Sequence, residues 1–106
     1  MIKGLLKKPG MKDGLIIDFK NLAEIRKTIK NALYYVFDSN NQIGIFLSDD
    51  GYMGEANKNI IFNQHIIYGA VVFVGISDFG EMKGITKRQR RIVEEYILKH
   101  NICKRL

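Results

Sequence analysis

Residues 65–77, HIIYGAVVFVGIS, form the longest apolar run of the chain. The run is rich in β-branched and aromatic side chains, and Gly69 and Gly75 interrupt it. It is shorter than the ~20 apolar residues that a membrane-spanning helix needs. From residue 70 to residue 76, apolar side chains occupy both sets of alternating positions, which is typical of a strand covered on each face. We therefore predict a strand over residues 70–76 in the middle of a sheet, with the rest of the chain assembled around it.

The composition is that of one small folded domain. The chain has 106 residues, of which 46% are hydrophobic and 26% are charged, ordinary values for a globular protein. We expect a single domain over residues 1–106. The lone cysteine, Cys103, has no internal disulfide partner, which fits a reducing compartment. The first residues, MIKGLLKK, lack the apolar segment of a signal peptide, so we expect a soluble, cytoplasmic protein without a membrane partner.

Charge is distributed unevenly along the chain, whose net charge is +6. Residues 1–37 contain eight basic and three acidic residues, a net charge of +5. Residues 38–81 contain Lys58 and six acidic residues, a net charge of −5. Residues 82–106 contain eight basic residues against Glu94 and Glu95, a net charge of +6. Such a pattern can steer a polar partner towards the protein without identifying it.

Hydrophobic periodicity and turn residues predict an α+β fold. The expected strands span residues 2–8, 14–19, 32–37, 43–47 and 70–76, with a short edge strand at 60–62. Residues 32–37, ALYYVF, are apolar at both sets of alternating positions, so we expect both faces of this strand to be largely covered. The fold class that follows is one small mixed or antiparallel sheet of about five strands. Two helices pack on it, in the order strand, strand, helix, three strands, helix.

Both helices begin with a capping-box pattern. In the first, Asn21 is followed three residues later by Glu24, and an apolar stripe continues to about residue 31. In the second, Thr86 is followed by Gln89, and an apolar stripe continues through Ile97. Each stripe predicts a helix that packs one face on the sheet.

Residues suited to catalysis or metal binding are few. Neither His65 nor His100 lies near a serine, cysteine or carboxylate in the arrangement of an activated nucleophile. His100 and Cys103 supply two ligand types, whereas structural zinc needs about four ligands. Residues 49–51, Asp-Asp-Gly, lack the carboxylate spacing of a calcium loop and indicate a turn. We therefore expect no catalytic residue, no cofactor and no metal, and a protein that is not an enzyme.

The second helix breaks a local rule. Lys87, Arg88, Arg90 and Arg91 crowd its first turns, where the helix dipole already places positive partial charge. Cations together with free N–H groups suit a phosphate or a carboxylate-rich surface. The alternative is a helix end that is merely solvated, with Glu94 and Glu95 offsetting part of the charge.

Four stretches of the chain are IIDFKNLAEIRKTI (16–29), SDDGYMGEANKN (48–59), IIYGAVVFVG (66–75) and ITKRQRRIVEEY (85–96). Together they resemble a small uncharacterised family, a domain of unknown function common in phages, prophages and plasmids. Lys87 and Arg88 stand where the family has acidic residues, so the basic helix is a peculiarity of this chain. The resemblance implies a protein of mobile elements, in the cytoplasm of an infected or lysogenic bacterium, and it carries no activity to transfer.

These observations favour an accessory protein that inhibits a bacterial defence component, such as a CRISPR effector, by stoichiometric binding. The partner would be a host defence protein or its nucleoprotein complex. The residues that we expect to bind it are basic or exposed and apolar: Lys87, Arg88, Arg90, Arg91, Leu98, Tyr52 and Met53.

Two other functions stay open. The first is a basic nucleic-acid-binding protein, which would use the cations of the last helix together with Lys104 and Arg105. The second is a small-ligand module that sequesters a signalling nucleotide at the start of that helix. A weak nucleic-acid contact and a homodimer are left open beside the host defence partner.

Overall fold

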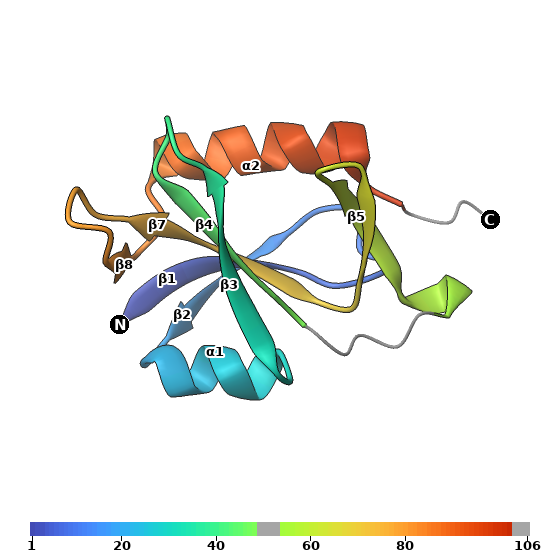
Figure 1. The fold of residues 1–106 in the computed structure, drawn as a ribbon, viewed down its shortest axis with the longest axis horizontal. Helices are drawn as coiled ribbons and strands as arrows, with labels where there is room; N and C mark the ends of the chain where they lie inside the picture. Colours follow the sequence, from blue (N-terminus) through green and yellow to red (C-terminus); the bar gives the residue numbers. More distant parts are fainter. Residues whose placement is uncertain (49–53, 103–106) are drawn as a thin grey trace.

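A six-stranded antiparallel sheet with one helix on each face organises the computed structural model, which describes residues 1–48 and 54–102 (Figure 1). The strand order is β2-β1-β7-β4-β3. A short strand, β8, pairs with Gly75 and Ile76 of β7, past the residues of β7 that pair with β1. Its strands are β1 (Ile2–Lys7), β2 (Leu15–Phe19), β3 (Ala32–Asp38), β4 (Ile43–Ser48), β7 (Val71–Ile76) and β8 (Met82–Lys83). The α+β class predicted from the sequence is confirmed, with every strand pair antiparallel.

Strand β7 is the centre of this sheet, as predicted. It pairs with β1 on one side and with β4 on the other, with Phe73 opposite both Leu5 and Ile45. Val71 and Phe73 contribute to the core beneath one helix, and Val72 and Val74 to the core beneath the other. All four side chains are fully buried, because each face of the strand is covered.

The two helices lie on opposite faces of the sheet. Helix α2 (Lys87–His100) covers the core that contains Val71 and Phe73, and helix α1 (Leu22–Thr28) covers the core that contains Val72 and Val74. In Figure 1 the sheet separates them, with α2 at the top and α1 at the bottom. One amphipathic stripe per helix is therefore enough to close both faces.

Helix α2 begins with the predicted capping box, complete between Thr86 and Gln89, whereas α1 has only half of the predicted box. In α1 the Asn21 side chain accepts from Glu24 N, but the Glu24 carboxylate accepts from Lys20 N, one residue before the cap. Helix α1 is shorter than predicted: it ends at Thr28, because Ile29 is extended and Asn31 has a positive φ of 49°. The apolar stripe alone could not reveal where the helix ends, because Ile29 lies beyond the helix and is still buried, so it continues the stripe.

The apolar run at residues 65–77 contributes to two strands. Gly69 breaks it at a φ of 84°, a conformation that glycine adopts without strain. Strand β6 (His65–Tyr68) before the break pairs with β5 (Lys58–Phe62), and these two strands form a separate small sheet. A short 3₁₀ helix, η1 (Glu55–Asn57), precedes β5. Asn63 and Gln64 both have positive φ and make the tight two-residue turn of this hairpin.

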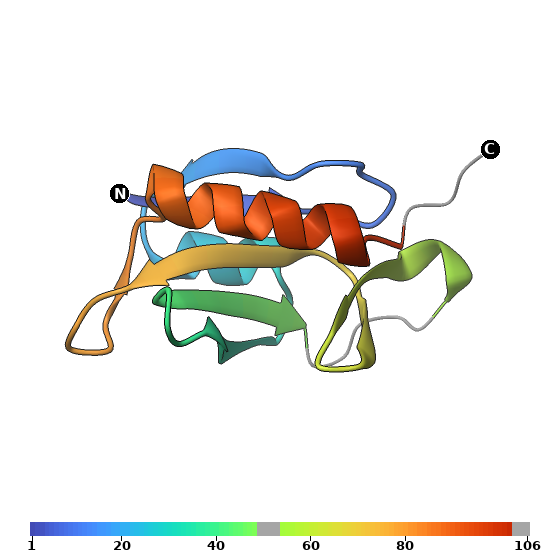
Figure 2. The same cartoon turned by 90° about the horizontal axis from the view of Figure 1, so that it is seen from above.

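The prediction for residues 32–37 was wrong in one respect. They do form strand β3, but β3 is the outer strand of the sheet and four of its apolar side chains are exposed: Leu33, Tyr34, Tyr35 and Val36. Helix α1 has only seven residues, and α2 lies over the middle strands. Figure 2 shows β2 and β3 at opposite edges of the sheet. A double-sided apolar pattern thus does not distinguish an edge strand from a central one.

Candidate functional site

Three of the residues predicted to bind a partner lie in one line on helix α2. Lys87, Arg91 and Leu98 are four and seven positions apart, spacings at which helical side chains lie on the same side. All three are exposed, and Leu98 has 77% of its surface accessible. Viewed from above, α2 lies in front of the sheet with no described segment over it (Figure 2). We call these three residues the outer face of α2.

The other two predicted cations, Arg88 and Arg90, lie beside this outer face and have neighbours within the protein. The Arg88 guanidinium donates to Asn41 Oδ1 at 2.7 Å, in the turn between β3 and β4. The Nε of Arg90 lies 3.3 Å from a Glu94 carboxylate oxygen, an exposed pair one helical turn apart. An exposed i, i+4 pair such as Arg90–Glu94 contributes only about 0.3–0.5 kcal/mol, and the Arg88 contact is exposed as well, so both side chains can exchange these contacts for a partner.

A buried glutamine holds this end of α2 against the sheet. Gln89 Oε1 accepts from Thr86 N at 2.9 Å and completes the capping box. Its Nε2 donates to the carbonyl oxygens of Asn41 and Gln42, at 3.0 and 2.8 Å. The sequence predicted the cap but not the two contacts with the turn, because residues more than forty positions away supply the acceptors.

Gly75 leaves room for the start of α2 to pack against β7. A Cβ at this position of β7 would lie 2.8 Å from Gly84 O and 2.9 Å from Gln89 Oε1. These distances are too short for a side chain, so only glycine lets the chain before α2 pass so close to the central strand. The cations of α2 therefore project from a helix start that is anchored to both β7 and the β3–β4 turn.

Several predicted site residues lie outside the described residues. They are Tyr52, Met53, Lys104 and Arg105, together with Cys103 of the weighed metal pair. His100 stacks on Tyr96, with ring centroids 4.0 Å apart, and its Nδ1 lies 3.0 Å from Tyr96 O. His65 lies on β6 and is exposed. Among residues 1–48 and 54–102, no three His, Cys, Asp or Glu side chains are grouped as metal ligands would be.

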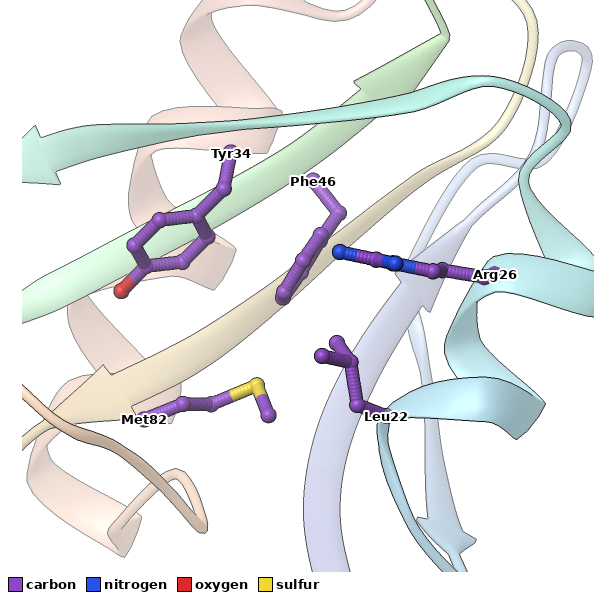
Figure 3. A pocket seen from close by; sticks show the side chains of 5 residues that line it. All are labelled: Leu22, Arg26, Tyr34, Phe46 and Met82. Atoms are coloured by element: carbon purple, nitrogen blue, oxygen red, sulfur yellow. The ribbon is translucent and has the colours of Figure 1, made fainter.

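An apolar cavity of about 230 Å³ lies on the opposite face of the sheet, beside α1 (Figure 3). Its lining residues come from α1, β3, β4 and β8: Leu22, Arg26, Tyr34, Phe46 and Met82. The rings of Tyr34 and Phe46 lie 4.8 Å apart, and burial raises the pKa of the Tyr34 phenol, which keeps it neutral. The cavity is smaller than the ~300 Å³ at which ligand pockets begin. It also lies across the sheet from the anion site expected at the start of α2.

The structure contains a buried polar cluster that the sequence did not predict. Lys7 is fully buried in β1, and its ammonium donates to Asn59 Oδ1 at 2.7 Å and to Lys8 O at 2.8 Å. The Asn59 amide in turn donates to Lys7 O and Gly69 O. This cluster joins the main sheet to the β5–β6 hairpin. No local pattern signals it, since lysine is almost always exposed.

Comparisons with known proteins identify no relative: no protein-family model, no curated protein and no solved structure matches the chain. The family resemblance drawn from the sequence therefore stays a prediction. Over residues 1–48 and 54–102, the structure has no helix with the length and apolar character needed to cross a membrane.

Proposed function

We propose that the protein acts by stoichiometric binding and that it inhibits a protein component of a bacterial defence system. The observation that carries the binding proposal is the outer face of α2. There, Lys87 and Arg91 are exposed near the anchored start of the helix, and Leu98 exposes a large apolar side chain further along the same face. Charged groups around an exposed apolar anchor are the usual elements of a protein interface. The resemblance to a family of mobile elements supports a defence component as the target.

Electrostatics indicate the chemistry of that target. Lys87, Arg88, Arg90 and Arg91 concentrate positive charge at one end of α2, where Glu94 pairs with Arg90. A complementary surface would be acidic there and would offer a hollow for Leu98 further along the helix. A phosphate-bearing partner carries negative charge as well and is therefore the natural competitor for these cations.

The test is an interference assay in bacteria that each carry one active defence system, a CRISPR system among them. The chain should raise the recovery of a targeted plasmid in at least one strain, and Lys87→Glu with Arg91→Glu should abolish that effect. The variant should remain fully folded, since an acidic residue in the first helical turn stabilises a helix by about 0.3–1 kcal/mol.

A matched control makes the same change of charge elsewhere. Lys20→Glu with Lys27→Glu alters two exposed lysines on the α1 side of the molecule. This control should keep the inhibitory effect. Equal activity of both double variants and the parent would show that the outer face of α2 takes no part in binding.

The four cations at the start of α2 also favour a second candidate, a nucleic-acid-binding protein. Each phosphate contact changes the log–log salt dependence of duplex binding by about −0.9. Four contacts would weaken binding by about two orders of magnitude between about 50 and about 200 mM salt. Tight duplex binding that persists at the higher salt, with no inhibition in any strain, would favour this second function over the first.

A further inference from the structure

Strand β3 presents an unpaired and unprotected sheet edge. It is the outer strand next to β4, and no strand within the described residues pairs with its other side. From Ala32 to Phe37 it carries no charged residue and no proline, the usual devices that keep an edge from pairing. Tyr35 and Val36 have 47% and 55% of their surfaces accessible.

The exposed side chains lie on both faces of this edge. Tyr34 packs on Phe46 on the α1 side, whereas Phe37 packs on Phe73 on the α2 side. Because neighbouring strand residues point to opposite faces, Leu33 and Tyr35 share the α2 side and Val36 shares the α1 side. A helix or loop laid on one face would leave the edge itself unpaired, whereas an added strand pairs with the edge and flanks the side chains on both faces.

The charges at the ends of β3 select the partner. Lys30 lies in the turn before the strand, with Asn31 at a φ of 49° between them, and Asp38 ends the strand after a register shift. In the sequence each is four positions from Tyr34, and the Asp38 carboxylate accepts from Asn41 N and Nδ2. An antiparallel copy of the same strand, paired about Tyr34, would bring the turn that holds Lys30 in each copy towards the Asp38 end of the other, with only neutral side chains between them. Such pairing brings opposite charges towards each other at both ends of the paired segment.

We propose that two copies of this chain associate through antiparallel pairing of their β3 strands, which joins the two sheets into one. The two-fold axis passes beside Tyr34. The pairing gives the exposed backbone N–H and C=O groups of the edge their partners and places cross-strand neighbours beside Leu33, Tyr35 and Val36. The dimer leaves the outer face of α2 open, because that face looks away from the sheet, so each copy keeps its own binding surface.

Sedimentation equilibrium and light scattering on the purified full chain test this proposal. The mass should rise with concentration from the 12.2 kDa of one chain to twice that value, through the micromolar range. Tyr35→Lys with Val36→Lys should raise the apparent dissociation constant by about tenfold or more, because a charged edge resists pairing. Both positions are exposed, so the circular dichroism spectrum and melting temperature should match those of the parent.

Further variants distinguish edge pairing from non-specific hydrophobic association. Leu15→Lys removes an apolar side chain that is 53% exposed on β2, the opposite edge of the sheet, and should leave the dimer intact. Lys30→Asp should weaken the dimer, whereas Lys30→Arg should not. A monomer at every concentration up to about 500 μM would overturn the proposal, because standard interfaces associate well below this range. A dimer that the two substitutions in β3 leave unaffected would overturn it too.

Discussion

At the scale of single residues, Lys7 shows how a charged side chain is accommodated in this interior. Its ammonium is fully buried, yet it has Asn59 Oδ1 and Lys8 O as acceptors within 2.8 Å. A buried charge is tolerated only where hydrogen bonds replace its water shell. Asn59 is itself fully buried, and its Nδ2 donates to Lys7 O and Gly69 O. This one asparagine, on β5, therefore satisfies polar groups of β1 and of the bend between β6 and β7.

Replacing Asn59 by alanine tests this role. We expect Asn59→Ala to lower the free energy of unfolding by about 1–3 kcal/mol, because it removes an acceptor from a buried ammonium and a donor from two carbonyls. Urea unfolding measures the loss. Asn40→Ala, at an exposed turn position, should change stability by less than about 0.5 kcal/mol. Equal stability of the two variants would show that the cluster is not needed.

At the scale of elements, the start of α2 depends on contacts that its own sequence does not contain. The capping box needs only Thr86 and Gln89, three residues apart. The anchoring of the helix needs the carbonyls of Asn41 and Gln42, which the β3–β4 turn brings to Gln89 Nε2. Tyr96 adds a second tie further along the helix, with its hydroxyl donating to Ile61 O at 2.6 Å.

Gln89→Leu keeps the size of this side chain approximately and removes its hydrogen bonds. We expect it to destabilise the protein by about 1–3 kcal/mol and to increase amide hydrogen exchange in the first turn of α2. Glu95→Leu, on the exposed side of the same helix, serves as the control and should change stability little. Unchanged exchange at residues 87–90 in Gln89→Leu would contradict the anchoring role.

At the scale of the whole molecule, β7 is shared by both cores. Its alternating side chains reach the α2 side and the α1 side, so a defect in β7 cannot remain local. A protein of this size has a total stability of about 5–15 kcal/mol, only a few times the cost of one buried unpaired charge.

Val72→Asp should therefore leave the protein unfolded or close to unfolding at 25 °C. Thermal melting followed by circular dichroism measures this, with Phe79→Asp as the control, because Phe79 is 90% exposed in the loop before β8. The control should melt cooperatively near the temperature of the parent. A cooperative melt of Val72→Asp at that temperature would show that β7 is not the central strand.

The amino-acid sequence by itself determined the features that depend on neighbours along the chain. The buried strand at residues 70–76, the cap residues Asn21 and Thr86, and the exposure of the cations of α2 follow from alternation, capping and charge, which act within a few residues. The turn at Asn63 and Gln64 could not be predicted in the same way, because neither is the glycine that usually marks such a hairpin.

Only the tertiary structure decided which strand lies at the edge and which charge lies inside. The sequences of β3 and β7 are both apolar on two faces, but β7 acquires two neighbours and β3 one. Lys7 is buried, whereas Lys8, next to it, is exposed. These outcomes depend on which distant segments pack together, and in a small protein the helices are too few to cover the whole sheet. The exposed edge and the buried lysine are therefore properties of strand order, which no local pattern encodes.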